Sequence, residues 1–173
     1  MQDDLIDALQ WAIDKGWVDR ERVCIAGASY GGYATLMGLA RDGERFRCGV
    51  AWVGVTDPRL LFGLPWINDI SQEARQYRLP TLIGDPKADA AMLAAVAPVE
   101  LAGRIKAPVL LAYGDKDSRV PIEHGERMRD ALRKAGNDPE WVVYPDEPHG
   151  WFKPANRYDF ARRMEAFLAR HLK

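Results

Sequence analysis

Gly27-Ala28-Ser29-Tyr30-Gly31-Gly32 is the stretch that decides the fold of this 173-residue chain. The apolar segment 22–26 before it is typical of a strand, and segment 33–40 after it is typical of a helix. A serine in a tight turn between a strand and a helix needs neighbours without side chains, because the two elements approach closely there. The pattern therefore predicts an exposed, reactive hydroxyl on Ser29. The alternative is that Gly31 and Gly32 only permit close packing of the helix on the strand.

The backbone beside the serine offers a place for negative charge. The N–H of Tyr30 lies at the start of the predicted helix, where the positive end of the helix dipole also lies. We therefore expect this N–H to stabilise an oxyanion that forms when Ser29 attacks a carbonyl carbon.

Composition and charge restrict the class of protein. The chain is 47% hydrophobic and 28% charged, which is ordinary for one globular domain spanning residues 1–173. Its 24 basic and 25 acidic residues leave a net charge of −1, so we expect neither nucleic acid nor membrane as a partner. No apolar run has the length of a membrane span. The acidic start, Met1-Gln2-Asp3-Asp4, is unlike a signal peptide, and the compartment is left open with the cytoplasm slightly favoured.

Helix-like and strand-like segments alternate along the chain. This order predicts an α/β fold with a mostly parallel sheet and helices on both faces. Strands are expected at 22–26, 48–53, 109–113 and 141–144. Helices are expected at 3–15, 30–41, 88–95, 98–104, 122–135 and 155–171. Segment 57–87 is interrupted by prolines yet rich in large apolar side chains, so we expect a compact insertion over the mouth of the site.

The cysteines and histidines give no metal-ligand pattern. No His/Cys cluster has the spacing of a metal site, and no metal is expected. Cys24 and Cys48 lie in apolar, strand-like segments and are expected to be buried and reduced rather than joined in a disulfide.

A serine hydroxyl needs a base, and His149 is the candidate. It lies in Pro145-Asp146-Glu147-Pro148-His149-Gly150, a turn between the last predicted strand and the last helix. Such a turn lies at the carboxyl end of the sheet, where open α/β folds place their sites. His124 and His171 fall within predicted helices and are interpreted as surface or structural histidines.

The carboxylate that orients the base is predicted to be Asp117. It follows the strand 109–113 and lies between serine and histidine in the chain, as in hydrolases with this serine turn. Asp115 and Asp57 are competitors. Asp115 lies close to the strand end and is expected to hydrogen-bond its own loop, and Asp57 precedes a proline and is expected to start a turn.

Together these motifs resemble the catalytic domain of the prolyl oligopeptidase family of serine peptidases. The resemblance rests on residues 27–33, Ala97-Pro98 with 105–111, 114–121 and 146–150, and it runs nearly end to end. It is closest to the branch of dipeptidyl peptidase IV and acylaminoacyl peptidase. It implies part of an α/β-hydrolase fold, no cofactor, and a peptide or a small ester or amide as substrate.

The resemblance also implies a role for single residues. Ser29 is the nucleophile, His149 the base and Asp117 its orienter, with the Tyr30 N–H as an oxyanion donor. Arg119 matches a position that holds a substrate carbonyl in this family. The pocket for the residue before the scissile bond falls on Val55, Leu61 and Val120. Leu61 replaces the aromatic ring of proline-specific members, so strict proline preference is not expected.

In the family, further N-terminal strands, an oxyanion loop and a β-propeller precede the segment that begins here at Met1. The resemblance therefore implies an internal methionine, and an unpaired edge on the strand 22–26. We expect aggregation or a homo-oligomer through that edge. Removal of one oxyanion donor costs about 10²–10³ in rate, so weak turnover is expected.

Three functions follow from the sequence. The first is a serine-type peptidase that forms an acyl-enzyme on Ser29. The second is a carboxylesterase or thioesterase with the same chemistry. The third is a truncated fragment with little or no activity that acts as an interaction piece.

Overall fold

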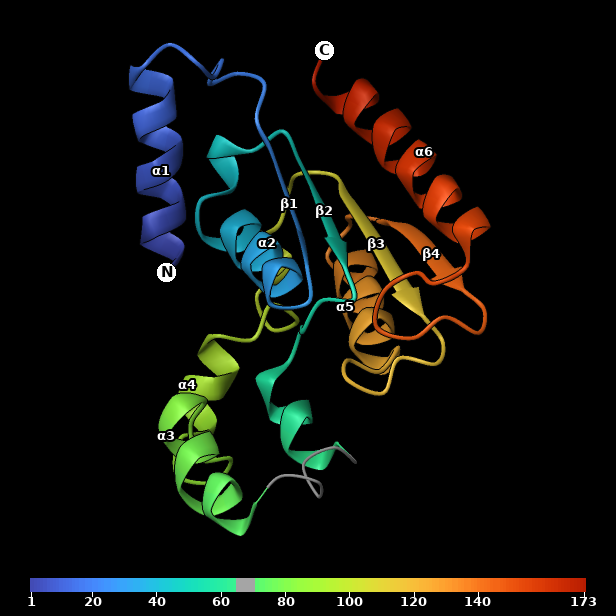
Figure 1. The fold of residues 1–173 in the computed structure, drawn as a ribbon. Coiled ribbons are helices and arrows are strands. Elements are labelled where there is room, and N and C mark those ends of the chain that lie inside the picture. The colour runs from blue at the N-terminus through green and yellow to red at the C-terminus, as the bar shows by residue number, and fades with distance from the viewer. Residues whose placement is uncertain (65–70) are drawn as a thin grey trace.

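Four short apolar segments form one parallel sheet (Figure 1). The computed structural model describes residues 1–64 and 71–173. The strands are β1 (Cys24–Ala28), β2 (Cys48–Trp52), β3 (Val109–Gly114) and β4 (Glu140–Tyr144). They lie in the order β1-β2-β3-β4, and each neighbouring pair is parallel. The predicted parallel sheet is confirmed, and β3 is buried along its whole length, as expected for a strand covered on both faces.

Helices cover both faces of this sheet, as predicted. The long helices are α1 (Gln2–Asp14), α2 (Tyr30–Arg41), α5 (Glu123–Lys134) and α6 (Pro154–His171). Side chains of α1, α2 and α5 pack in one apolar cluster with Ala51, Leu111 and Tyr113 of the sheet. On the opposite face, α6 inserts Phe160 and Phe167 against β2, β3 and β4. No helix in the described part of the chain is long and apolar enough to cross a membrane.

The predicted helix 98–104 is wrong. This segment forms turns that end in a short 3-10 helix, Ala102–Arg104. Its N–H groups donate three residues back, as from Leu101 to Pro98, and the N–H of Val99 donates to the carbonyl of Thr56 in the loop after β2. Contacts with the rest of the fold therefore outweigh the local helical pattern, and Gly103 weakens that pattern further.

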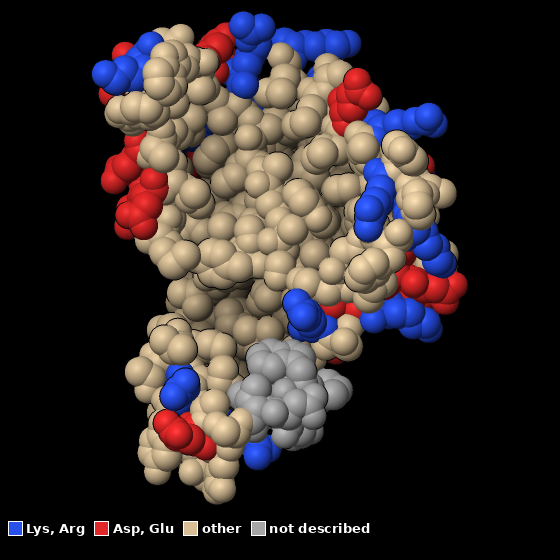
Figure 2. All heavy atoms as spheres, viewed as in Figure 1, with Lys and Arg blue, Asp and Glu red and all other residues tan. Residues whose placement is uncertain are grey.

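The segment 57–87 forms a lobe of short elements beyond the carboxyl ends of the strands (Figure 1). It contains a 3-10 helix (Pro58–Gly63), a π-helical turn (Ala74–Arg78) and α3 (Leu79–Leu82), and α4 (Ala90–Ala95) follows. Figure 2 shows a hollow where this lobe meets the sheet, and charged side chains gather at the margins of that view. Trp66, one of the large apolar residues of this segment, lies outside the described residues.

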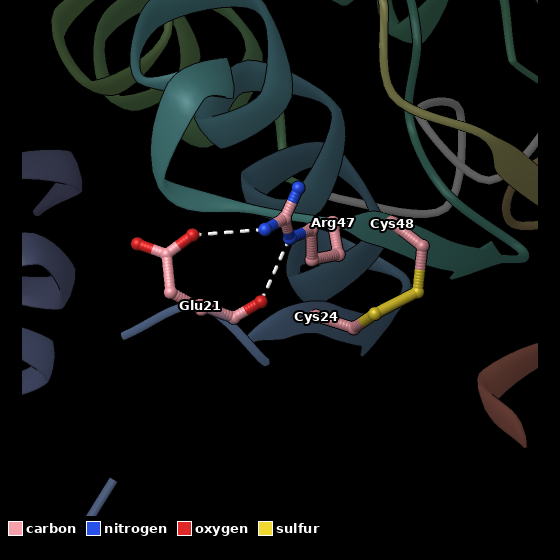
Figure 3. The surroundings of a disulfide bond; sticks show 4 residues. All are labelled: Glu21, Cys24, Arg47 and Cys48. Carbon is pink, nitrogen blue, oxygen red and sulfur yellow. Dashed lines mark hydrogen bonds and ion pairs between the residues drawn. A yellow bond between two sulfur atoms is a disulfide. The ribbon is translucent and has the colours of Figure 1, made fainter. Parts of the chain in front are cut away.

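The two cysteines form a disulfide, which corrects the expectation of free thiols (Figure 3). Cys24 and Cys48 are register partners on β1 and β2, with Cα atoms 4.7 Å apart, which is within the range that a disulfide spans. The sequence shows two buried cysteines but not the register that brings them face to face. Beside the bond, Arg47 donates to the carbonyl and the carboxylate of Glu21, which adds a second link between the segments that lead into these strands.

In the described part of the chain, β1 has a strand partner on one side only. Along its other edge, the backbone N–H and C=O groups have no neighbouring strand among the described residues to pair with, as the sequence predicts. Pairing of this edge with another chain stays a prediction.

Breaking the disulfide should destabilise the fold. The bond joins residues 24 positions apart, and closing a loop of that length stabilises a protein by about 3 kcal/mol. Dithiothreitol should therefore lower Tm by about 6–12 °C, as measured by circular dichroism during heating. The double variant Cys24→Ala/Cys48→Ala is the control, because its Tm should not respond to the reductant. Two titratable thiols in unfolded, unreduced wild-type chain would contradict the disulfide.

Candidate active site

Ser29 lies in a strained turn between β1 and α2. Its backbone has φ 57° and ψ −117°, in a region that non-glycine residues rarely occupy. A Cβ on Gly27 would overlap the carbonyl group of Gly31, and a Cβ on Gly32 would lie 2.7 Å from the Cα of Gly54. The glycines are therefore required for the turn itself and for the approach of α2 to the end of β2. The predicted tight turn is confirmed.

The turn leaves the Ser29 hydroxyl at the carboxyl edge of the sheet. Its Oγ lies 2.9 Å from Nε2 of His149, and Nδ1 of His149 lies 2.7 Å from Oδ2 of Asp117. With the ring proton on Nδ1, the imidazole donates to the carboxylate and accepts from the hydroxyl. The three residues follow β1, β3 and β4, whose carboxyl ends meet at this edge.

Asp117 is held in place by its own loop. Its side chain is buried, and Oδ1 accepts the backbone N–H groups of Arg119 and Val120, each at 2.9 Å. One oxygen is thus tied to the backbone while the other faces the imidazole.

The competing carboxylates are engaged elsewhere. Asp57 accepts from the guanidinium of Arg59 at 2.7 and 2.9 Å. Burial alone would raise the pKa of Asp57, but the hydrogen bonds from Arg59 outweigh it and hold that pKa below its usual value. Asp115 accepts the N–H of Asp146 at 2.6 Å. It therefore braces the turn that carries His149, whereas the sequence suggested a bond within its own loop.

Two cavities flank Ser29. One of about 400 Å³ contains every residue that the sequence predicts for substrate binding; it is lined by Ser29, Val55, Leu61, Arg119, Val120 and His149. A second, of about 450 Å³, shares Ser29, Val55 and Leu61 and adds the predicted oxyanion residue Tyr30. Leu82 and Ile83 of the lobe also line the second cavity, so the segment 57–87 contributes to the mouth of the site as expected. Both cavities have the size of small-molecule sites.

The N–H of Tyr30 begins the first turn of α2, where backbone donors have no acceptor within the helix. Among the described residues, no group of three or more His, Cys, Asp or Glu side chains is arranged to hold a metal.

His124 is a structural histidine, which is one of the two alternatives that the sequence leaves open, and it supports this site through a contact that the sequence does not show. It is buried, its Nδ1 accepts the N–H of Thr56 at 3.1 Å, and its carbonyl accepts the Thr56 hydroxyl at 2.8 Å. Thr56 follows Val55, which lines both cavities. The spacing of His124, Met128 and Leu132 at every fourth residue is the signal that places this imidazole on the buried face of α5. His171 is half-buried, and its ring packs on Phe167.

Comparisons with known proteins agree with this geometry. A family model described as the prolyl oligopeptidase family matches residues 1–173. Dipeptidyl aminopeptidase BIII of Pseudoxanthomonas mexicana is 38% identical over 99% of this chain and 25% of its own length. Dipeptidyl peptidase family member 6 of Caenorhabditis elegans is 32% identical over 97% of this chain and 23% of its own.

A solved structure of a puromycin-hydrolyzing peptidase of Mycobacterium tuberculosis superposes with a TM-score of 0.84. It is 26% identical, and the match covers 99% of this chain and 25% of that one. The chain therefore spans about a quarter of the length of these relatives, and within that quarter the fold is the same.

The burial of His124 predicts a pH dependence of stability. Burial disfavours the charged imidazole and lowers its pKa to about 4, whereas in the unfolded chain it is near 6.5. The unfolded state then binds more protons between these values, so stability is fully present above pH 6.5 and falls as the pH drops towards 4. His124 should account for about 3 kcal/mol of this loss at pH 4.

Urea unfolding of wild type and His124→Asn between pH 4 and 7.5 measures this effect. The variant should be less stable at pH 7.5 but should lose about 3 kcal/mol less on acidification. His171→Asn is the matched control and should follow wild type. Parallel curves for wild type and His124→Asn would rule the effect out.

Proposed function

Because this chain belongs to the prolyl oligopeptidase family, we propose that it is a serine-type peptidase whose nucleophile is Ser29. The observation that carries the proposal is the unbroken hydrogen-bond chain from the Ser29 hydroxyl through His149 to Asp117. We further propose that residues 1–173 belong to a single catalytic domain.

The proposed reaction begins with attack of Ser29 Oγ on the carbonyl carbon of the scissile peptide bond. Nε2 of His149 takes the hydroxyl proton, and Asp117 holds the ring in the tautomer that can accept it and stabilises the imidazolium. Negative charge on the former carbonyl oxygen faces the N–H of Tyr30 and the positive end of α2. His149 then gives its proton to the leaving amine, which leaves an acyl group on Ser29. Water that loses a proton to His149 releases the acyl group and restores the hydroxyl.

We propose that the residue before the scissile bond is apolar and of moderate size. Val55, Leu61 and Val120 give the smaller cavity aliphatic walls. Burying an unpaired charged side chain there would be costly, because nothing in the apolar wall replaces its water. Arg119 lies at the exposed rim of the same cavity, where its guanidinium can donate to a backbone carbonyl of the substrate.

We also propose that two copies of the chain associate through β1. The free edge of β1 offers backbone donors and acceptors to a second strand. An edge of this kind pairs two identical chains through one shared surface.

A fluorophosphonate probe tests the nucleophile directly. The probe forms a bond to an activated serine, so folded wild type should be labelled at Ser29 and Ser29→Ala should not be labelled at all. Mass spectrometry of the labelled peptide identifies the residue. Circular dichroism establishes that both proteins are folded. If folded wild type is not labelled, the nucleophile proposal is wrong and the chain is the inactive fragment.

Paired substrates separate the peptidase from the esterase. Aminoacyl-p-nitroanilides carry an amide and p-nitrophenyl esters carry an ester, and we expect Ser29-dependent hydrolysis of both. Cleavage of esters alone, by a folded and probe-reactive enzyme, would favour the carboxylesterase or thioesterase.

The size of the pocket can be altered at Leu61. Leu61→Ala should raise kcat/KM for a phenylalanyl substrate relative to an alanyl one by about 10-fold, because a few methylene groups of space correspond to a difference of that order. Leu5→Ala, which shortens an exposed leucine on α1 outside both cavities, is the matched control and should leave the ratio unchanged. If the ratio of kcat/KM for the two substrates is equal in all three proteins, Leu61 does not line the pocket for the residue before the scissile bond.

A further inference from the structure

Glu147 is a fully buried carboxylate two residues before His149. Its two oxygens accept three hydrogen bonds: from the N–H of Phe152 at 2.7 Å, from the N–H of Lys153 at 2.9 Å and from the side-chain amide of Asn156 at 2.6 Å. Lys153 is the residue at the start of α6. The side chain thereby closes the segment 147–153, which contains His149, into a ring anchored on the end of a long helix.

The charge of Glu147 suits this position. Burial by itself would raise its pKa, but the hydrogen bonds from Phe152, Asn156 and Lys153 outweigh burial and hold the pKa below its usual value. The positive end of the α6 dipole favours the same charged form. The carboxylate therefore keeps its negative charge, and all three donors, throughout the neutral pH range.

The backbone of the same residue reaches a second loop. The carbonyl of Glu147 accepts the N–H of Lys116 at 3.0 Å, and Lys116 directly precedes Asp117. A Cβ on Gly114 would overlap this carbonyl, so the approach of the two loops depends on a glycine there. Side chain and backbone of Glu147 thus fix the turn of His149 to α6 and to the loop of Asp117 at once.

We propose that Glu147 is a positioning residue for the reaction, which sets the place of the His149 imidazole between Ser29 and Asp117. The inference rests on the proposed serine-peptidase function. Glu147 lines neither cavity beside Ser29, so it acts through the loop that it holds. Because proton transfer needs the hydroxyl and the imidazole in hydrogen-bond reach, displacement of the loop by about 1 Å is enough to slow the reaction about 10²-fold.

Glu147→Gln tests the proposal with the smallest change of shape. The amide nitrogen of glutamine cannot accept a hydrogen bond. The N–H groups of the new side chain therefore face at least one of the three N–H donors that the carboxylate accepts from in wild type. We expect kcat, and the rate constant of fluorophosphonate labelling, to fall between about 10- and 100-fold. KM should stay within about 3-fold of wild type, because the apolar wall of Val55, Leu61 and Val120 is untouched.

The control separates positioning from a general loss of stability. Asn137 donates to the carbonyls of Ile105 and Ala107, away from both cavities. Asn137→Ala therefore removes partly buried hydrogen bonds of the same kind without touching the loop of His149. At a temperature where circular dichroism finds all proteins folded, it should label and turn over at the wild-type rate.

Asn156→Ala covers the case in which Glu147→Gln does not fold. It removes one of the three donors to the carboxylate, and a smaller loss of labelling rate, about 3- to 10-fold, is expected. If folded Glu147→Gln is labelled at the wild-type rate, the positioning role alone is overturned. If Glu147→Gln does not fold, the same result with Asn156→Ala overturns it. A folded wild type that is never labelled at Ser29 overturns the proposed function and this inference with it.

Discussion

The left-handed backbone at Ser29 is the constraint on which the rest of the site depends. It turns the chain from β1 into α2 within one residue, and it is possible only because the neighbouring glycines leave room. Val53 and Asp146, which follow the ends of β2 and β4, also have positive φ. All three unusual residues lie at the same edge of the sheet. Strain of this kind persists where surrounding contacts fix it, as the bond from the Ser29 N–H to the carbonyl of Trp52 does.

Below this edge, polar side chains hold the loops, and two of them, His124 and Glu147, are buried. His124 fixes Thr56 beside the cavity wall, Asp115 fixes the N–H of Asp146, and Glu147 fixes the loop of His149. Each buried group is costly to desolvate, and these hydrogen bonds offset the cost while they restrict the loops to one arrangement. The apolar clusters on the two faces of the sheet stabilise the fold, whereas these polar contacts determine where the reactive groups lie.

Local patterns were sufficient to predict much of this structure. The serine turn, the four strands and the long helices follow from glycine placement and hydrophobic period, because those signals reside within single segments. The prediction of free thiols at Cys24 and Cys48 is wrong, because the disulfide depends on the register of two strands that are separated by a helix. The prediction of a helix at 98–104 is wrong for a similar reason, since a bond from Val99 ties this segment to Thr56 in another loop. The fold and the grouping of Ser29, Asp117 and His149 were thus readable from the sequence, whereas the supporting contacts of Asp115, His124 and Glu147 were not.

The hydroxyl of Ser29 and the imidazole of His149 are 120 residues apart in the chain, and β2, β3 and β4 all lie between them. During synthesis the serine emerges long before its base, and the sheet cannot present the two together until its last strand has docked. A growing chain on the ribosome therefore carries an inert alcohol. Under the proposed function, this distance delays reactivity, because Ser29 has no base until the loop after β4 has folded onto the sheet.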